Sequence, residues 1–439
     1  MKRADELRGL KDLVVAAIKG GTTTVERMHA SIARRPFDAL DRVPVTRIPA
    51  RATRTIHDGI AGSIYKGLRG LADLAGSAAG LALTPFDHRL PARDDPSPAA
   101  WDHAIGALNA VVGDRLERAR NGLRMRMEFR HRGRPLALET EALRRAYPAA
   151  ARKIAVFVHG LAGNERVWRF YSEEHHGDRR TTYGSLLERD LGYSPLYVRY
   201  NSGLHISENG GLLADTIGTL VHAWPVPLDE IVLVGHSMGG LVARSACHQG
   251  KQRGNGWVDR VRHIFCLGTP HLGAPLEKIG NVTGWILNAF DVTRPFGSIV
   301  NGRSVGIKDL RFGYLVEEDW RGRDLDDLLE DNRQDIPFLD SAAHYFIAAT
   351  VTEDPNHPVG FLLGDALVRF PSASGRGARL ARGMPFRAEH GRHLGPMTHL
   401  RLLNHPAVYD QIRLWLGPTA AGARGRPSSS RAPRRLPGY

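Results

Sequence analysis

Short apolar runs separated by amphipathic segments dominate the middle of the chain and predict a parallel sheet covered by helices. Five runs, KIAVFVHG, PLYVRY, EIVLVGHS, HIFCLGTP and HYFIAATV, begin at residues 153, 195, 230, 263 and 344. Apolar runs of this length are typical of strands that are buried on both faces. Upstream, LRMRMEFR at 123–130 alternates apolar and polar residues and, with RPLALE at 134–139 as its partner, predicts an antiparallel edge hairpin.

The same pattern divides the chain into three parts. Residues 1–120 predict a helical N-terminal extension, and residues 121–416 predict the domain that contains the sheet. Residues 417–439 carry five arginines and no acids among Gly, Pro and Ser, and predict a disordered basic tail. Within the domain, the stretch 276–339 breaks the alternation of strands and helices and predicts a lid-like insertion over the carboxyl edge of the sheet.

The N-terminal extension contains an unusual segment rich in Gly and Ala, at 56–86. Small residues along an apolar face allow either close packing on the domain or shallow seating in a membrane interface, and packing is the favoured interpretation. A linker with Pro and Asp residues follows at 91–98. Residues 101–120 then predict an amphipathic helix that leads into the domain.

The charge of the chain is strongly basic. Sixty Lys and Arg residues against 46 Asp and Glu residues give a formal net charge of +14. This balance favours anionic partners, in particular peripheral contact with an anionic membrane or lipid surface. Nucleic acid is not expected as a partner, because neither zinc-finger cysteines nor an RNA-binding aromatic signature accompanies the charge. No pattern specifies an oligomeric state.

The N-terminus and the cysteines bear on where the chain works. The apolar run at 13–18 ends at Lys19, which makes it too short for a signal-peptide core. No run of about 18 uncharged apolar residues predicts a spanning helix. We therefore expect a cytoplasmic protein. The two cysteines, Cys247 and Cys266, do not support a disulfide scaffold and predict two buried small hydrophobic side chains.

The run Gly235-His236-Ser237-Met238-Gly239 joins an apolar strand to a helix-like segment. In this setting a G-x-S-x-G turn exposes its serine above the sheet edge, and the flanking glycines let the strand and helix backbones approach each other. The following helix presents free N–H groups where an oxyanion would develop. We therefore predict that Ser237 is a catalytic nucleophile; a glycine-bounded turn without chemical use is the alternative.

The strand at 153–158 leads into His159-Gly160-Leu161-Ala162-Gly163-Asn164, a loop that predicts the second part of an oxyanion hole. One donor would be the backbone N–H of Met238, directly after the nucleophile. The second would be the N–H of Leu161, because His159-Gly160 lets the chain turn with its amides pointing inward. His159 itself is expected to stabilise the loop rather than to transfer protons.

In hydrolases with this turn the chain order is Ser, then an acid, then His. Asp365 lies after a glycine and before an apolar run, which suits a buried carboxylate that orients an imidazole. Asp354, with its neighbour Glu353, is the reserve candidate. It lies in the Pro-flanked turn EDPNHP, where Asp is favoured for conformational reasons alone.

Four histidines compete for the role of general base. His399 is the predicted base, because it lies on the loop before the C-terminal helix and can reach back over the strand ends. His405 precedes a proline and is expected to cap that helix. His390 and His393 are expected to be exposed loop residues.

These motifs together resemble those of bacterial lipases and esterases of the α/β-hydrolase superfamily, including the branch similar to GPI inositol-deacylases. The motifs that carry the resemblance are VHGLAGN at 158–164, GHSMGG at 235–240, LGTPHLGAP at 267–275, GDALV at 364–368 and THLRLL at 398–403. The resemblance spans residues 123–416 and implies an α/β-hydrolase fold, with Ser237, Asp365 and His399 as a triad. It also implies that His271 is not the base. Where lipases often have GDG, this chain has Gly364-Asp365-Ala366, which keeps the carboxylate.

The implied reaction is hydrolysis of carboxylic esters, of a lipid-like or acyl kind, through an acyl-enzyme and without a cofactor. The apolar insertion predicts a lid over a lipophilic acyl pocket. No metal is expected, because His175, His176 and Asp178 lack the spacing of a metal site and are interpreted as a polar surface loop.

Two other functions remain open. One is a protein that binds a membrane or granule surface and has weak or no hydrolase activity, which the net charge and the arginine tail favour. The other is an acyltransferase that uses the same three residues, since only the access of water to the acyl-enzyme separates transfer from hydrolysis.

Overall fold

The computed structural model describes residues 99–274, 304–324, 331–376, 384 and 386–417. The predictions for the segment 56–86, for the linker and for the basic tail concern residues outside these ranges. The division into an extension, a domain and a tail, and the role of the insertion as a lid, therefore remain predictions.

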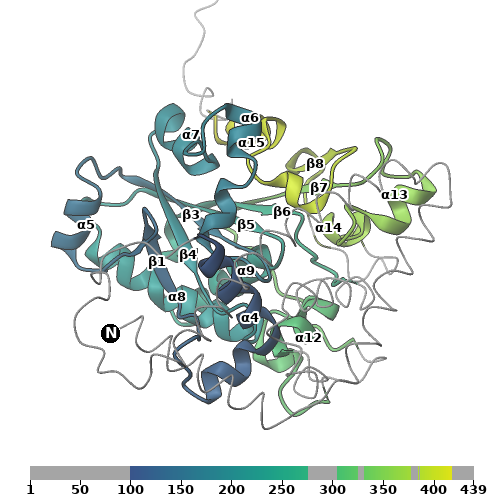
Figure 1. Ribbon diagram of the computed structural model, residues 1–439, viewed down its shortest axis with the longest axis horizontal. Helices are drawn as coiled ribbons and strands as arrows, with labels where there is room; N and C mark the ends of the chain where they lie inside the picture. Colours follow the sequence, from purple (N-terminus) through teal and green to yellow (C-terminus); the bar gives the residue numbers. More distant parts are fainter. Residues whose placement is uncertain (1–98, 275–303, 325–330, 377–383, 385, 418–439) are drawn as a thin grey trace, which may run out of the picture.

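A central eight-stranded sheet organises the described part of the chain, in the order β2-β1-β4-β3-β5-β6-β7-β8 (Figure 1). The strands are β1 (Glu128–His131), β2 (Arg134–Pro135), β3 (Lys153–Val158), β4 (Ser194–Arg199), β5 (Glu230–His236), β6 (Val261–Leu267), β7 (Ala343–Ala349) and β8 (Gly391–Leu394). Strands β3 to β8 pair in parallel, and β1 is antiparallel to β2 and β4. The α/β-hydrolase fold expected from the sequence is confirmed.

Each apolar run of the sequence forms one of the parallel strands, β3 to β7. The antiparallel hairpin is also present, but its edge strand is the two-residue β2, and β1 pairs on both sides. Strand β8 was not expected from the pattern, because Gly391–Leu394 contains a single large apolar residue. Its position beside β7 comes from long-range pairing, which a local pattern does not reveal.

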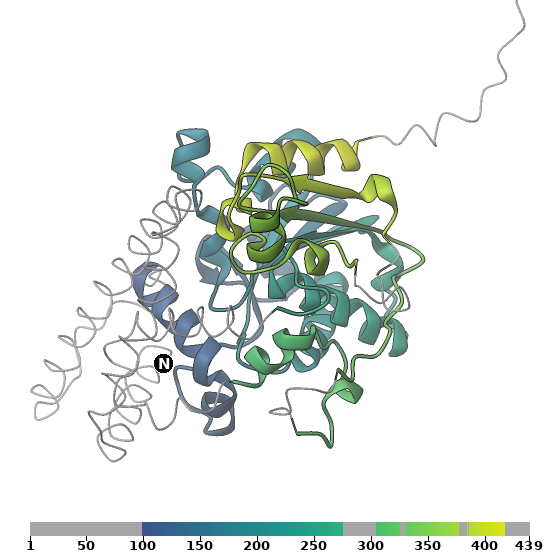
Figure 2. The same ribbon diagram turned by 90° about the vertical axis from the view of Figure 1, so that its right-hand side faces the viewer.

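Helices cover both faces of the sheet. The α-helices of the described residues are α4 (Ala99–Arg118), α5 (Thr140–Ala146), α6 (Ser172–His176), α7 (Tyr183–Leu191), α8 (Ile206–Ala223), α9 (Met238–Gln252), α12 (Val305–Phe312), α13 (Pro358–Leu363), α14 (Phe370–Ala373) and α15 (Pro406–Leu416). In both views α15 lies above the sheet and α12 below it (Figures 1 and 2). Within the described residues, no helix has the length and apolar character needed to cross a membrane.

Two apolar layers hold the helices to the sheet. Alternate residues of one strand supply both layers: Ile154 and Val156 of β3 face α8 and α9, whereas Ala155 and Phe157 face α7 and α15. All four are fully buried. This arrangement explains why the strands read as continuous apolar runs rather than as alternating ones.

Both cysteines lie in these layers. Cys247 on α9 and Cys266 on β6 are buried and free. Burial raises the pKa of Cys266 to about 11 and that of Cys247 further, so both thiols remain protonated. The expectation of two small buried hydrophobic side chains is confirmed.

The two layers predict a large contrast between two Leu→Ala substitutions. Leu233 on β5 is fully buried, whereas Leu414 on α15 is 73% exposed. We expect Leu233→Ala to lower the free energy of unfolding by about 2–5 kcal/mol, because it leaves a cavity. Leu414→Ala should change it by less than about 0.5 kcal/mol. Urea denaturation measures both, and equal effects would contradict the assignment of the core.

Candidate active site

Ser237 occupies the sharp turn between β5 and α9. Its backbone is left-handed, with φ 55° and ψ −126°, a conformation that a residue with a Cβ rarely adopts. The turn is fixed by two hydrogen bonds: Ser237 N donates to Leu267 O at 2.8 Å, and Gly240 N donates to Ser237 O at 3.1 Å. From Ile231 to Gly240, Ser237 is the one residue that is not buried. The turn therefore leaves Ser237 more accessible than the residues on either side of it.

Glycines make this turn sterically possible. A Cβ on Gly235 would collide with the backbone nitrogen of Gly240, and one on Gly239 would overlap the carbonyl oxygen of Val158. Strand β5, helix α9 and strand β3 are thus packed backbone to backbone around Ser237. The two glycines of the G-x-S-x-G motif have the steric role that the sequence predicted for them.

Asp365 and His399 form a buried pair. His399 Nδ1 lies 2.6 Å from Asp365 Oδ2, and both side chains are almost fully buried. The other carboxylate oxygen, Oδ1, accepts hydrogen bonds from the amides of Leu367 at 3.0 Å and Val368 at 2.7 Å. The backbones also meet, since His399 N donates to Asp365 O at 2.9 Å. These contacts fix the imidazole with Nδ1 toward the carboxylate.

His399 lies beside the turn that carries Ser237. The ring of His236 lies 4.7 Å from the ring of His399, and its Nε2 lies 3.2 Å from His399 O. A Cβ built on Gly268, which follows the strand next to β5, would lie 3.0 Å from His399 Cε1. Among the described residues, no hydrogen bond joins the hydroxyl of Ser237 to His399. Such bonds are often long in unliganded enzymes and tighten when substrate binds.

The loop after β3 touches the same turn. A Cβ on Gly160 would lie 2.9 Å from Ser237 Cβ. The next amides are occupied, since Ala162 N donates to Ser202 Oγ at 3.2 Å and Gly163 N to Gly160 O at 3.2 Å. Within the described part of the chain, the amides of Leu161 and Met238 have no such acceptor. These two amides belong to the two segments that meet beside Ser237.

His159 stabilises this loop, as expected. Its Nδ1 donates to Gly160 O at 2.8 Å, its Nε2 accepts from Tyr200 N at 3.3 Å, and its ring stacks on Tyr200 at 4.2 Å. Burial lowers the pKa of His159 to about 4. The ring is therefore neutral at physiological pH and acts through hydrogen bonds rather than charge.

The other candidates for the acid and the base do not join the pair of Asp365 and His399. Asp354 is exposed, and its carboxylate accepts a hydrogen bond from Asn356 N inside its own turn. His405 caps α15, as predicted, by accepting from Ala407 N at 3.2 Å. The prediction that His393 is an exposed loop residue is wrong: it lies on β8, half-buried, with Nε2 at 2.8 Å from Thr350 Oγ1. The cause is the pairing of β8 with β7.

Two further histidines, His390 and His271, also have structural contacts. His390 is half-buried against the ring of Tyr345, at 4.4 Å, and is thus less exposed than expected. His271 is buried, and its Nδ1 accepts from Arg244 Nη1 at 3.2 Å. Among the residues that the structure describes, no group of three His, Cys, Asp or Glu side chains could hold a metal ion.

Comparison with known proteins supports the resemblance seen in the motifs. Residues 151–325 match the model of a family described as the PGAP1-like alpha/beta domain. No curated protein matches the chain in sequence. The match includes the turn at Ser237 and the loop at Leu161, and it ends before Asp365 and His399.

A lipase, a lipase-esterase related protein and a thioesterase are among the solved structures similar to this chain. A Bacillus licheniformis lipase in its mature form is 17% identical, with a TM-score of 0.37, over 61% of this chain and 92% of that one. A lipase-esterase related protein from Clostridium acetobutylicum is 13% identical, with a TM-score of 0.32, over 61% of this chain and 95% of the other. A type II thioesterase of yersiniabactin biosynthesis is 14% identical, with a TM-score of 0.34, over 61% and 93%. Similarity at this level carries no information about the substrate.

Two buried histidines beside the site, His159 and His236, should bind protons only at unusually low pH. Burial, followed by the charge of His399, lowers the pKa of His236 to about 3, and burial lowers that of His159 to about 4. At pH 5 an ordinary histidine, with a pKa near 6.5, is protonated, whereas these two should remain neutral. Imidazole ¹⁵N chemical shifts measure this directly, and protonation of either ring at pH 5 would contradict the described burial.

The lowered pKa values of His159 and His236 also predict how the free energy of unfolding changes with pH. Below pH 6.5 the unfolded chain binds protons at these two positions that the folded chain does not. The two rings should therefore make the free energy of unfolding fall as the pH falls from about 6.5 to about 4 for His159 and about 3 for His236.

Proposed function

We propose that this chain is a serine hydrolase that cleaves carboxylic esters through an acyl-enzyme intermediate. Ser237 is the nucleophile, His399 the general base and Asp365 the residue that orients the base. The amides of Leu161 and Met238 form the oxyanion hole. The observation that carries the proposal is the 2.6 Å contact between His399 Nδ1 and Asp365 Oδ2, buried beside a half-buried serine with positive φ.

The tautomer of His399 follows from that contact. The ionised carboxylate accepts the Nδ1 proton, so Nε2 carries a lone pair that can take the proton of the Ser237 hydroxyl. Ser237 Oγ then attacks the ester carbonyl carbon, and the resulting oxyanion accepts hydrogen bonds from the two free amides. His399 next gives the proton to the departing alcohol. A water molecule, activated by the same imidazole, releases the acid and restores the serine.

A lipid-like or acyl substrate is supported by the resemblance of the sequence motifs, LGTPHLGAP at 267–275 among them, to those of lipases and esterases. Peripheral contact with an anionic lipid surface is supported by the net charge of +14. No cofactor enters any of these steps. Transfer of the acyl group to another alcohol would use the same residues, with that alcohol in place of water.

Removal of the nucleophile should abolish the reaction. We expect Ser237→Ala to lower kcat for p-nitrophenyl esters by at least about 10⁴-fold and to abolish labelling by a fluorophosphonate. Ser341→Ala, two residues before β7 and away from the turn at Ser237, is the matched control and should retain both. Esters from acetate to palmitate separate an esterase from a lipase. A folded wild-type protein that is neither labelled nor active on any ester would refute the proposal.

The acid of the triad can be tested against its rival. Asp365→Asn removes the charge and favours the wrong imidazole tautomer, so kcat should fall by about 10³- to 10⁴-fold. Asp354→Asn, the same change in an exposed turn, should alter kcat by less than about 2-fold. Steady-state kinetics of the two variants decide between the carboxylates. Loss of activity in Asp354→Asn alone would reverse the assignment.

A further inference from the structure

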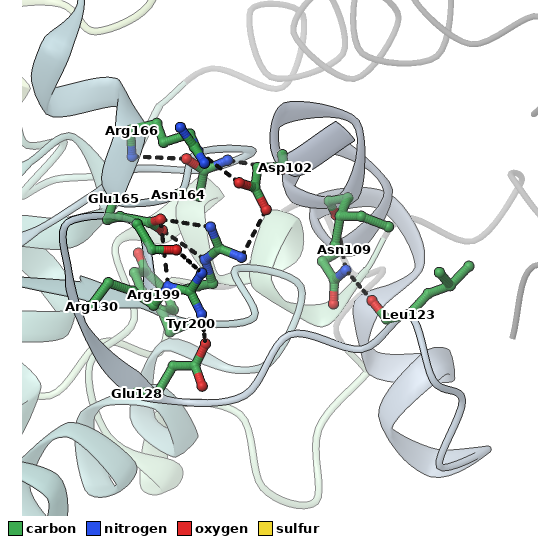
Figure 3. A network of polar contacts seen from close by, with 12 residues as sticks. Asp102, Asn109, Leu123, Glu128, Arg130, Asn164, Glu165, Arg166, Arg199 and Tyr200 are labelled. Atoms are coloured by element: carbon green, nitrogen blue, oxygen red, sulfur yellow. Dashed lines mark hydrogen bonds and ion pairs between the residues drawn. The ribbon is translucent and has the colours of Figure 1, made fainter. Parts of the chain in front are cut away.

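A buried charge network joins helix α4 to the loop that carries Leu161 (Figure 3). Asp102, in the first turn of α4, is 3% exposed. Its Oδ2 accepts from Arg166 Nε at 2.6 Å, and its Oδ1 accepts from Arg199 Nη1 at 2.9 Å. Arg199 ends β4, and Arg166 follows the loop directly. One carboxylate of α4 thus ties together two arginines of the sheet domain.

Arg199 completes the network with a second carboxylate. Its Nε and Nη2 donate to the two oxygens of Glu165, each at 2.6 Å, in a bidentate pair. Burial alone would raise the pKa of Glu165, but the hydrogen bonds and charge of Arg199 outweigh it, so the pKa is lowered. Glu165 therefore stays ionised, and Arg199 bridges it to Asp102 (Figure 3).

The backbone of α4 also touches the loop directly. A Cβ on Gly106 would lie 2.9 Å from the carbonyl oxygens of both Ala162 and Gly163. Asn164 Nδ2 donates to Asp102 O at 2.8 Å, and the same side chain accepts from Arg166 N at 2.8 Å. The peptides next to Leu161 therefore rest on a helix, with no space for another side chain between them.

The C-terminal half of α4 is also anchored by hydrogen bonds. Asn109 donates to Leu123 O at 2.9 Å and accepts from Met125 N at 2.8 Å, all within buried surroundings. Asn201 Nδ2 donates to Gly113 O at 2.9 Å. These contacts fix the helix to the segment leading into β1 and to the end of β4. The helix is therefore a fixed support for the loop.

We propose that Asp102 and Gly106 of α4 are positioning residues for the oxyanion hole. They hold the loop at 160–164 so that the N–H of Leu161 points to the same place as that of Met238. This inference rests on the proposed function, and it extends the active site to a helix that precedes the family match at 151–325. A buried ion network is by itself weak evidence for stability, because desolvation offsets the attraction of the charges. A role in positioning the loop at 160–164 can instead be tested through kcat and through the binding of an oxyanion.

The test uses the full chain and two variants that disturb the support without touching the substrate. Asp102→Asn weakens the link to Arg199 and Arg166, and Gly106→Ala pushes a methyl group against the loop carbonyls. Gly218→Ala on α8 is the matched control, because its Cβ would meet nothing closer than 3.7 Å. Active sites are titrated with a fluorophosphonate, so that unfolded protein does not enter kcat.

We expect Asp102→Asn and Gly106→Ala to lower kcat per titrated site by about 10-fold or more, with KM changed by less than about 2-fold, as for weakened binding of an oxyanion. The inhibition constant of a trifluoromethyl ketone, which forms an oxyanion on the serine, should rise by the same factor. Gly218→Ala should match wild type in all three values. If Asp102→Asn does not fold, Gly106→Ala carries the test.

A normal kcat per titrated site and a normal ketone inhibition constant, with only a lower melting temperature, would overturn the inference and leave α4 a purely structural element. That result leaves the proposed function intact, because wild type would still be labelled and active. Wild type that is neither labelled nor active would overturn the proposed function and this inference together.

Discussion

The approach of three backbones around Ser237 is the constraint on which the rest of the structure depends. Strand β3, strand β5 and helix α9 meet there at separations that leave no room for a side chain at Gly235 or Gly239. Only under that packing is a left-handed serine retained at the end of a buried strand. The apolar layers on both faces of the sheet hold the strands in place, and the turn then leaves Ser237 more accessible than the residues on either side of it.

Asp365 and His399 lie near this turn in space although they are far from Ser237 in the sequence. Asp365 follows β7 and His399 follows β8, yet their side chains and their backbones meet within hydrogen-bond distance. Asn404, just before α15, donates to Trp168 O at 2.6 Å and Phe170 O at 3.0 Å. The segment that carries His399 is therefore fixed to the segment after the loop at 160–164. One connected framework thus holds His399, Asp365 and that loop.

Much of this arrangement could be predicted from the sequence, because its signals are local. The apolar runs gave five parallel strands, and the turn chemistry at Ser237 needs only the five residues of its motif. The pairing of Asp365 with His399 agreed with the chain order of such hydrolases, although the roles of both residues remain a proposal. Strand β8 was missed, and with it the surroundings of His393, since polar residues form a strand there only by pairing with β7.

The charge network was missed for a different reason. Asp102, Glu165 and Arg199 are far apart in the sequence, and each alone looks like an ordinary surface charge. Their burial follows from the packing of α4 against the end of β4, which no spacing rule describes. A charged residue within an otherwise apolar strand, as Arg199 is in β4, was the one available signal. The length of Arg199 allows it to reach two carboxylates from different elements.

The position of Asp102 also bears on how far the polypeptide can be shortened from its N-terminus and still fold. The family match begins at residue 151. The buried ion pairs of Arg166 and Arg199, however, include Asp102, which precedes that match. A polypeptide that starts between these positions would lack the buried carboxylate that accepts hydrogen bonds from both Arg166 and Arg199. Its missing helix would also uncover the carbonyls of Ala162 and Gly163. We therefore expect the smallest autonomous folding unit to include α4, so that the boundary of homology is not the boundary of folding.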